Sequence, residues 1–264
     1  MGRRVNDRYQ YYYPKPEAEK RALRDLIRGI DPDILAVQEM GKWPYLWELR
    51  RDLKSEGLNY PHIALFEGED PVRHLALLSK LAFETTLVAP SELNFFYGDE
   101  QHTPKRGLQA VVFTTKDGKQ WTLFNLHLKS RLSRNKSDPQ SRYRRTAEAR
   151  SIALYIEQNY ANRPNALYLM VGDWNDGLES PALNFFLQPR PNNRLIAKSI
   201  PCQDKGGKTW TYHYRKKNSH WEFDHLLASP RLFQKLVDGR GYIAQEVSGS
   251  DHRLIYADFE FGVE

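Results

Sequence analysis

The sequence has almost no cysteine and no long apolar run. Cys202 is the only cysteine among the 264 residues, which excludes an internal disulfide and a zinc site built from cysteines. No apolar run approaches the roughly 18 residues of a transmembrane helix, and Met1–Tyr9 contains no hydrophobic signal region. We expect a protein without an integral membrane segment, either cytoplasmic or, if an upstream signal was removed, secreted.

The composition is that of a globular protein with an excess of positive charge. Hydrophobic residues make up 40% and charged residues 27% of the chain, and the net charge is +6. This charge suits a polyanion such as DNA or RNA, but enzymes of small phosphates are often basic too. Because repeats and linkers are absent from the sequence, we expect residues 1–264 to form one domain. We also expect the protein to be a monomer.

Apolar periodicity predicts a mixed fold with more strands than helices. Asp117-Gly118 between two strand patterns predicts a hairpin, and residues 189–207 are expected to form a polar loop. Hairpins mixed with helical crossovers favour an α+β or layered α/β fold. The expected helices cover residues 16–30, 44–56, 141–159 and 181–187. The expected strands cover residues 34–37, 60–65, 74–78, 83–88, 108–114, 120–125, 166–171, 209–214, 223–228, 242–246 and 254–261.

The most informative string is Val171-Gly-Asp-Trp-Asn-Asp176. The apolar run Ala166–Val171 leads directly into it, which is typical of a buried strand that ends at a carboxylate and a carboxamide. Asp173 and Asn175 lie two positions apart, so in an extended backbone their side chains point the same way.

Four further polar sites adjoin apolar strands. They are Glu39, His127, Asp224 and the pair Asp251-His252. In antiparallel sheets the ends of some strands meet the beginnings of others, so all of these residues could share one rim. Carboxylates gathered there would repel one another without a cation, and oxygen ligands favour Mg²⁺ or Mn²⁺, with Ca²⁺ a further option. Such a set suits hydrolysis of a phosphoester.

Each site also has a structural interpretation. Glu39 could lie in a solvated turn, Asp173 could cap a turn through its side chain, and Asp251 could belong to a turn before the last strand. His127 could be a satisfied histidine in a strand. Asp224 is harder to explain in this way, because an unpaired acid in an apolar strand is costly. The joint pattern favours a functional site.

Five motifs together resemble those of the endonuclease/exonuclease/phosphatase superfamily, and they occur in the expected order between Pro16 and Phe261. The resemblance implies a four-layer αββα sandwich of two facing, mostly antiparallel sheets with the site at one end. The motifs are Leu35-Ala-Val-Gln-Glu39, Asn125-Leu-His-Leu-Lys129, Gly172-Asp-Trp-Asn175, Phe223-Asp-His225 and Ser250-Asp-His252.

The resemblance also implies roles for the first group of residues. Glu39 would bind the divalent metal. Asp173 would orient or deprotonate the attacking water, and Asn175 would donate to the phosphoryl oxygens. His127 would stabilise the pentacovalent phosphorus.

The remaining roles concern phosphate binding and proton transfer. His252 would bind phosphate or act as acid or base, oriented by Asp224. Asp251 would complete the metal or proton network. Arg106, in Lys105-Arg-Gly107 before a strand, would contact the phosphate.

The chain departs from the superfamily pattern at its start. Members begin with a strand that brings an asparagine to the site, whereas this chain opens with polar and aromatic residues. Asn6 has no apolar strand before it, so the role is not transferred to it. The chain was cut, or its start was placed too late, or the first strand is absent, which would expose an interior sheet edge.

The substrate is expected to be a phosphoester, and DNA or RNA is favoured by a basic stretch directly after His127. That stretch could grip a phosphate backbone or simply form a solvated helix face. Tyr9 and Tyr11–Tyr13 could stack on bases or cover a sheet edge. Without a membrane-inserting hairpin, a sphingomyelinase is disfavoured. The basic residues are Arg131, Arg134, Lys136, Arg142, Arg144, Arg145 and Arg150.

We therefore expect a Mg²⁺-dependent, nuclease-like phosphodiesterase. One alternative is a phosphomonoesterase that acts on a small phosphorylated metabolite or lipid head group. Another is a binding module that keeps the fold without turnover, which only the missing asparagine favours. A calcineurin-like metallophosphatase is disfavoured because its Gly-Asn-His-Asp type of motif is absent.

Overall fold

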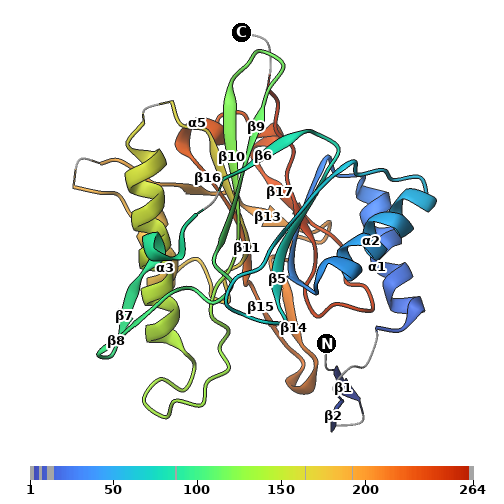
Figure 1. Cartoon of the computed structure of the whole chain (residues 1–264), viewed down its shortest axis with the longest axis horizontal. Helices are drawn as coiled ribbons and strands as arrows, with labels where there is room; N and C mark the ends of the chain where they lie inside the picture. The colour runs from blue at the N-terminus through green and yellow to red at the C-terminus, as the bar shows by residue number, and fades with distance from the viewer. Residues whose placement is uncertain are drawn as a thin grey trace.

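Two sheets face each other and carry helices on both outer sides, as the computed structural model of the chain shows (Figure 1). The structure describes residues 3–5, 8–10, 15–86, 88–163, 165–191 and 193–261. Asn6 and Tyr11–Tyr13 lie outside these residues, as does the side chain of Tyr9. The architecture confirms the expected four-layer αββα sandwich.

The larger sheet has six strands in the order β12-β16-β11-β10-β9-β6. β10 and β11 pair in parallel and the other pairs are antiparallel. The Asp117-Gly118 hairpin forms as predicted and joins β9 to β10. The strands are β6 (Phe83–Thr86), β9 (Leu108–Thr114), β10 (Gln120–His127), β11 (Tyr168–Asp173), β12 (Lys198–Ser199) and β16 (Asp224–Ala228).

The facing side consists of two short sheets, ordered β3-β5-β4 and β13-β17-β18. Three hairpins complete the strands. The first sheet contains β3 (Ile34–Met40), β4 (His62–Phe66) and β5 (His74–Ser79). The second contains β13 (Cys202–Gln203), β17 (Gly241–Ile243) and β18 (Ile255–Tyr256). The hairpins pair β1 (Arg3–Val5) with β2 (Arg8–Gln10), β7 (Phe95–Tyr97) with β8 (Glu100–His102), and β14 (Tyr212–Tyr214) with β15 (Ser219–Trp221).

Two pairs of helices form the outer layers. Pro16 precedes the first turn of α1 and the acidic Glu17 and Glu19 lie within it, which favours this helix start. In Figure 1, α1 and α2 cover one side and α3 the other. The helices are α1 (Glu17–Ile30), α2 (Trp43–Ser55), α3 (Arg142–Ile156), α4 (Pro181–Leu187) and α5 (Pro230–Phe233), with short turns η1 (Pro90–Leu93), η2 (Glu157–Ala161), η3 (Arg215–Lys217) and η4 (Val237–Gly239).

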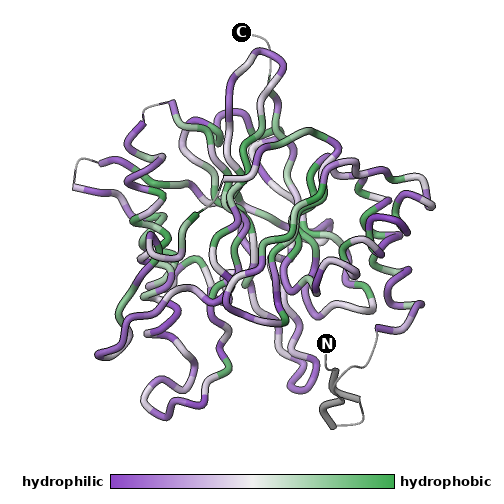
Figure 2. Tube along the Cα trace, viewed as in Figure 1, coloured by the Kyte–Doolittle hydropathy of each residue, from purple (hydrophilic) through white to green (hydrophobic). Residues whose placement is uncertain are grey.

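The core follows the alternation of side chains along each strand. In β10, Leu123 faces the space between the sheets and Phe124 faces the layer of α3. A third apolar cluster, around Leu46 and Leu53, joins α1 and α2 to β5. The hydropathy trace shows apolar segments concentrated along the central strands (Figure 2).

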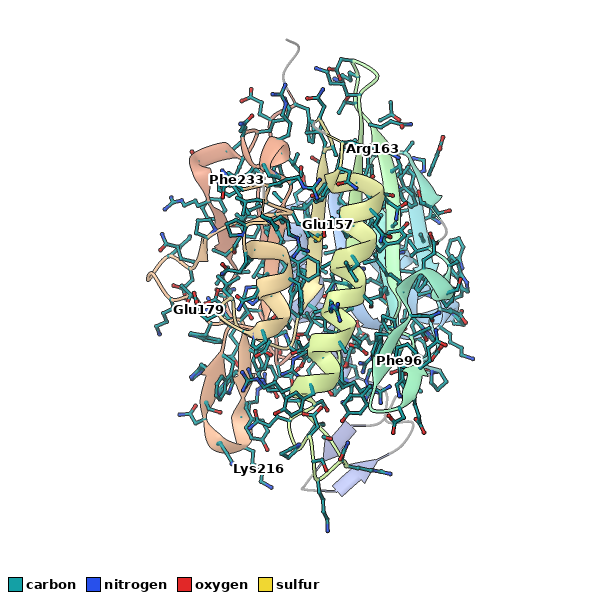
Figure 3. All side chains as sticks on the ribbon, turned by 90° about the vertical axis from the view of Figure 1, so that its left-hand side faces the viewer. Phe96, Glu157, Arg163, Glu179, Lys216 and Phe233 are labelled. Carbon is teal, nitrogen blue, oxygen red and sulfur yellow. The ribbon has the colours of Figure 1, made fainter. Side chains whose placement is uncertain are left out.

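Some predicted elements were wrong in extent. The expected loop 189–207 contains the short strands β12 and β13, and the expected strand 254–261 is a strand only over Ile255–Tyr256. The helix expected over residues 141–159 is an α-helix only to Ile156 and changes to a π-helix at Glu157. The hairpin β7–β8 was not predicted. It packs beside α3, and Phe96 projects from it in Figure 3. Short strands without alternation carry too little pattern to be recognised.

A large groove separates β3 from β18. Within the described residues, β3 pairs only with β5 and β18 only with β17, so each has an edge without a strand partner. Residues of both strands line one cavity of about 2310 Å³, whose floor includes Leu169 and Leu226 of the larger sheet.

Gly172 lets β10 and β11 approach each other. Its φ is 146°, and a Cβ there would lie 1.9 Å from the carbonyl oxygen of Leu126 on the neighbouring strand. Any side chain would therefore force the two strands apart immediately before their polar ends.

Candidate active site

Strand pairing alone aligns three of the predicted site residues. The parallel register of β10 and β11 sets His127 beside Asp173. The antiparallel register of β11 and β16 sets Asp224 on the other side of Asp173. The two strand ends and one strand beginning thus form a single row at one edge of the larger sheet.

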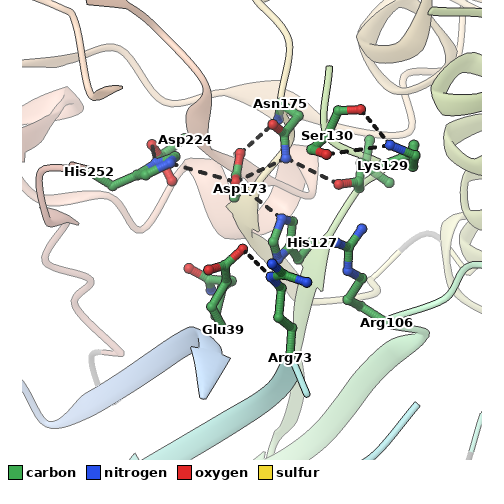
Figure 4. Close-up of polar contacts among 12 residues, drawn as sticks. Glu39, Arg73, Arg106, His127, Lys129, Ser130, Asp173, Asn175, Asp224 and His252 are labelled. Atoms are coloured by element: carbon green, nitrogen blue, oxygen red, sulfur yellow. Dashed lines mark hydrogen bonds and ion pairs between the residues drawn. The ribbon is translucent and has the colours of Figure 1, made fainter. Parts of the chain in front are cut away.

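The Asp173 carboxylate lies at the centre of this row (Figure 4). Its Oδ2 is 3.3 Å from Nε2 of His127 and accepts a 3.0 Å hydrogen bond from Nδ2 of Asn175. Its Oδ1 accepts a 2.8 Å bond from the backbone N–H of Asn175. Asn175 has φ 54°, a left-handed conformation that turns its side chain back toward Asp173.

Both amide hydrogens of Asn175 already have acceptors. The second hydrogen goes to the carbonyl oxygen of Leu128 at 3.1 Å. Donation from Asn175 to a phosphoryl oxygen therefore requires one of these bonds, most simply the bond to Asp173, to be exchanged.

His252 and Asp224 form a second pair on the far side of Asp173. Nδ1 of His252 lies 2.8 Å from Oδ2 of Asp224, and Nε2 lies 3.9 Å from Oδ2 of Asp173. The ring of Tyr212 lies against the imidazole with 4.8 Å between centroids. The imidazole is thereby held between two carboxylates and one aromatic face.

Burial and neighbouring charges shift the protonation of these groups. Burial raises the pKa of the Asp173 carboxyl to about 7, with Asp224 adding to the rise and His252 opposing it. Burial opposes the charged form of His252, but the charge and hydrogen bond of Asp224 raise its pKa to about 10. Burial, reinforced by the positive charge of Arg106, lowers the pKa of His127 well below its usual value. His252 is therefore an imidazolium and His127 a neutral imidazole at neutral pH.

Glu39 lies at the end of β3, across the cavity from the larger sheet. The pairing of β3 with β5 shifts register between Val37 and Met40, and Glu39 has φ 56°. Such an irregularity re-aims a side chain at a strand end. Its side chain is 57% exposed, and the carboxylate pairs with Nε of Arg73 at 3.1 Å.

Arg106 and Asp251 flank this group. Arg106 is 8% exposed, and its guanidinium points toward His127 in Figure 4. Nε of Arg106 lies 3.3 Å from Oδ2 of Asp70. Asp251 is exposed beside His252, whose pKa its charge helps to raise. All the predicted site residues line one cavity.

The prediction missed a buried polar network that joins the two sheets. Asn125 is fully buried and accepts a 2.6 Å bond from Nε2 of Gln38. Its Nδ2 lies within 3.1 Å of the carbonyl of Ala76 and of Oε1 of Gln109. The amide in the apolar run of β10 was the available signal, because a buried carboxamide needs partners.

A second missed feature supports the turn after Asp173. Arg145 is 1% exposed and donates from Nε and Nη2 to Oδ2 of Asp176 at 3.0 and 2.9 Å. Arg131 donates to Oδ1 of Asp176 at 2.8 Å and to the carbonyl of Asn175 at 3.2 Å. The interpretation that Arg145 binds a phosphate backbone is therefore wrong, because its guanidinium is buried and paired with Asp176.

The carboxylates at this edge of the sheets fit a hard divalent cation, but the side chains differ in their ability to act as metal ligands. Asp173, Asp224 and His252 each offer an atom within 4.8 Å of one another. A protonated His252 has no lone pair for a metal, whereas the carboxylate of Glu39 faces the cavity. One or two carboxylates with waters and phosphate oxygens are the usual surroundings of Mg²⁺.

The layers and the row of polar strand ends define an αββα sandwich protein with its site at one end of the facing sheets. The model of the Endonuclease/Exonuclease/phosphatase family matches residues 10–252. The chain belongs to this family, whose members include nucleases, phosphodiesterases and phosphatases, and are typically hydrolases of phosphoester bonds. A search of curated proteins finds no match.

Solved structures share the fold at low sequence identity. The human Nocturnin catalytic domain with bound sulfate anion is 17% identical, with TM-score 0.61 and coverage of 95% of this chain and 89% of that chain. A beta toxin from Staphylococcus aureus is 16% identical, with TM-score 0.64 and 94% coverage of both chains. The mannosyl-6-phosphatase of Bacteroides thetaiotaomicron is 16% identical, with TM-score 0.57 and coverage of 92% and 91%. Over the described part of the chain, none of the helices has the length and apolar character needed to cross a membrane.

Proposed function

We propose that the protein is a divalent-metal-dependent, nuclease-like phosphodiesterase. The observation that carries this proposal is the Asp173 carboxylate, held between neutral His127 and Asn175, with the charged His252 3.9 Å away. A carboxylate fixed among hydrogen-bond donors at a strand end is suited to orient and deprotonate a water molecule beside a phosphoryl group.

Asp173 is the general base of the proposed reaction. Its carboxylate accepts a proton from water as the water oxygen bonds to phosphorus, and the ester oxygen leaves from the opposite face. The pKa of about 7, raised by burial, is close to the working pH, where a base combines availability with proton affinity.

The neighbouring side chains stabilise the charge that develops on the phosphoryl oxygens. His127 donates from a neutral ring, and Asn175 donates once its bond to Asp173 is exchanged. His252, held by Asp224, supplies a positive charge and a proton for the leaving oxygen. Groups fixed in advance in a buried site stabilise such charge efficiently.

Glu39 would hold the divalent cation, with Asp251 on the edge of the same cavity as a supporting charge. When bound, Mg²⁺ would polarise a phosphoryl oxygen and offset the negative charge of the substrate. Mn²⁺ or Ca²⁺ would meet the same oxygen ligands. Arg73 pairs with Glu39 at 3.1 Å, and both side chains line the cavity.

The form of the cavity favours a diester over a monoester. The cavity extends past His127 to Lys129 and Arg144 on one side and past His252 to the β14–β15 hairpin on the other. Substituents on both sides of a phosphate therefore have room. The basic side chains on its wall suit a nucleic acid strand.

The test is an activity panel with Mg²⁺, Mn²⁺, Ca²⁺ and EDTA. The substrates are plasmid DNA, single-stranded DNA and RNA, bis-p-nitrophenyl phosphate and p-nitrophenyl phosphate. We expect metal-dependent cleavage of the diesters. Cleavage of the monoester alone would replace this proposal with a phosphomonoesterase, and substrate binding without turnover would indicate a binding module.

A further inference from the structure

Opposite charges occupy the two sides of His127. The acids Asp173 and Asp224 lie on one side, and the bases Arg106, Lys129 and Arg144 line the cavity on the other. After burial, the positive charge of Arg106 is the strongest influence that lowers the pKa of both His127 and Lys129. These cations are therefore close enough to act on one another electrostatically.

Arg106 has an incomplete set of partners. It is 92% buried, and its Nε makes no hydrogen bond although it lies 3.3 Å from Oδ2 of Asp70. Its guanidinium is directed toward His127 and the cavity (Figure 4). A buried guanidinium with an unused donor favours an anion at that position.

Lys129 and Arg144 continue this positive wall. Nζ of Lys129 bonds to the carbonyl oxygens of Ser130 at 2.9 Å and Leu132 at 2.5 Å, which leaves its charge without a carboxylate partner among these bonds. Arg144 packs over the ring of Tyr97, and its Nε is buried without a hydrogen bond.

Two acids lie close to the group, and of its three cations Asp70 pairs only with Arg106. Glu148 is fully buried and accepts the backbone N–H of Lys129 at 2.7 Å, and its burial raises its pKa. Three cations beside one ion-paired acid leave a net positive charge, which a bound anion would offset.

We propose that Arg106, Lys129 and Arg144 form a second anion subsite, which binds a phosphate group next to the phosphate that is cleaved. The preferred substrate is then a phosphodiester that carries a second phosphate one nucleotide unit away. This inference rests on the proposed function, because it assigns the neighbouring phosphate of the same substrate.

Two thymidine substrates with the same scissile bond test the subsite. One is the p-nitrophenyl ester of thymidine 5′-phosphate, and the other carries an additional 3′-phosphate. We expect the 3′-phosphate to raise kcat/KM about 10-fold, mainly through a lower KM, as a charge-assisted contact would. The Arg144→Gln variant should reduce this ratio to about 2-fold or less.

Arg142→Gln is the matched control. Arg142 lies two positions away on the same helix and is exposed outside the cavity lining, so its ratio should equal that of the wild type. Equal kcat/KM for the two substrates in the wild type would overturn the subsite. Failure to cleave either substrate would instead overturn the proposed function.

A binding measurement separates the two proposals further. Titration of inorganic phosphate into the protein in EDTA should show binding that Arg144→Gln weakens about 5-fold and Arg142→Gln leaves unchanged. Equal phosphate affinity in the wild type and Arg144→Gln would contradict the subsite. Circular dichroism of each variant shows whether it is folded.

Discussion

The larger sheet and the β3–β18 side of the molecule differ in how completely their strands are paired. In the larger sheet, β11 lies between β10 and β16, and its residues are buried throughout. On the other side, β3 and β18 have open edges on a shared groove. The proposed base and its partners lie on the fully paired sheet, whereas the proposed metal ligand Glu39 lies at the open side.

The two sides therefore differ in how rigidly they hold their site residues. The atoms that must meet within hydrogen-bond distance are held by strand register, as His127 and Asp173 are. Glu39 is half exposed and placed by an irregular strand end, so its position is easier to adjust around a cation and a substrate. Variants that affect the two sides differently can break or sharpen this comparison.

The largest effect is expected from Asp173→Asn. Removal of the base should lower kcat about 10³-fold or more, and extra metal should not restore it. Glu39→Gln should instead raise the Mg²⁺ concentration needed for half-maximal activity on the order of 10-fold, with partial recovery at high Mg²⁺.

Metal titration of activity, together with Mn²⁺ binding by calorimetry, separates these two responses. The exposed Asp25→Asn on α1 serves as the control, with activity and metal dependence unchanged. Full activity of Asp173→Asn would end the proposed mechanism. Metal rescue of that variant would move Asp173 from the role of base to that of ligand.

A stability comparison uses neighbouring leucines of β16. Leu227 is fully buried against the α3 layer, and Leu226 faces the groove. Leu227→Ala should lower the free energy of unfolding by about 2–5 kcal/mol, because it leaves a new cavity in packed surroundings. Leu226→Ala should lower it by about 1–2 kcal/mol, because a cavity already exists there. Urea unfolding measures both, and equal losses would show that the groove is closed in solution.

The smallest effect is expected from pH. Burial, reinforced by Arg106, lowers the pKa of Lys129 to about 8. The ammonium is therefore charged at pH 7.5 and mostly neutral near pH 9.5. The charged groups that act on it are Arg106, Arg144, Arg145 and, from α3, Glu148. Inorganic phosphate affinity should fall by up to about 10-fold over this range, because the group loses its charge as pH rises through its pKa. Lys129→Met should remove most of this pH dependence. An equally steep fall in phosphate affinity in that variant would show that another group titrates.

The sequence predicts the row of site residues better than the groups that support it. Apolar strands that end in polar residues are visible in the chain, and sheet pairing alone brings His127, Asp173 and Asp224 together. The pairing of Arg145 with Asp176 could not be read in this way, because a buried arginine looks the same as its exposed neighbours in a basic stretch. The left-handed conformation of Glu39 also has no local signal, because glutamate rarely adopts a positive φ.

The same distinction applies to the fold. Long strands such as β9 and β10 and the helix α4 were predictable because alternation, a turn dipeptide and a serine-proline start mark them. β12, β13 and β15 contain two or three residues each, and only their partners make them strands. For such short segments the information lies in the neighbouring strand and not in the segment itself.

Gly172 has a consequence that extends beyond strand packing. With only hydrogen at its Cα, this residue can lie against the carbonyl oxygen of Leu126, where a Cβ would come within 1.9 Å. His127 and Asp173 are the next residues on the two strands, so their separation inherits whatever spacing position 172 allows. The glycine therefore sets the distance between the Asp173 carboxylate and the His127 imidazole. Any substitution at position 172 would change that distance.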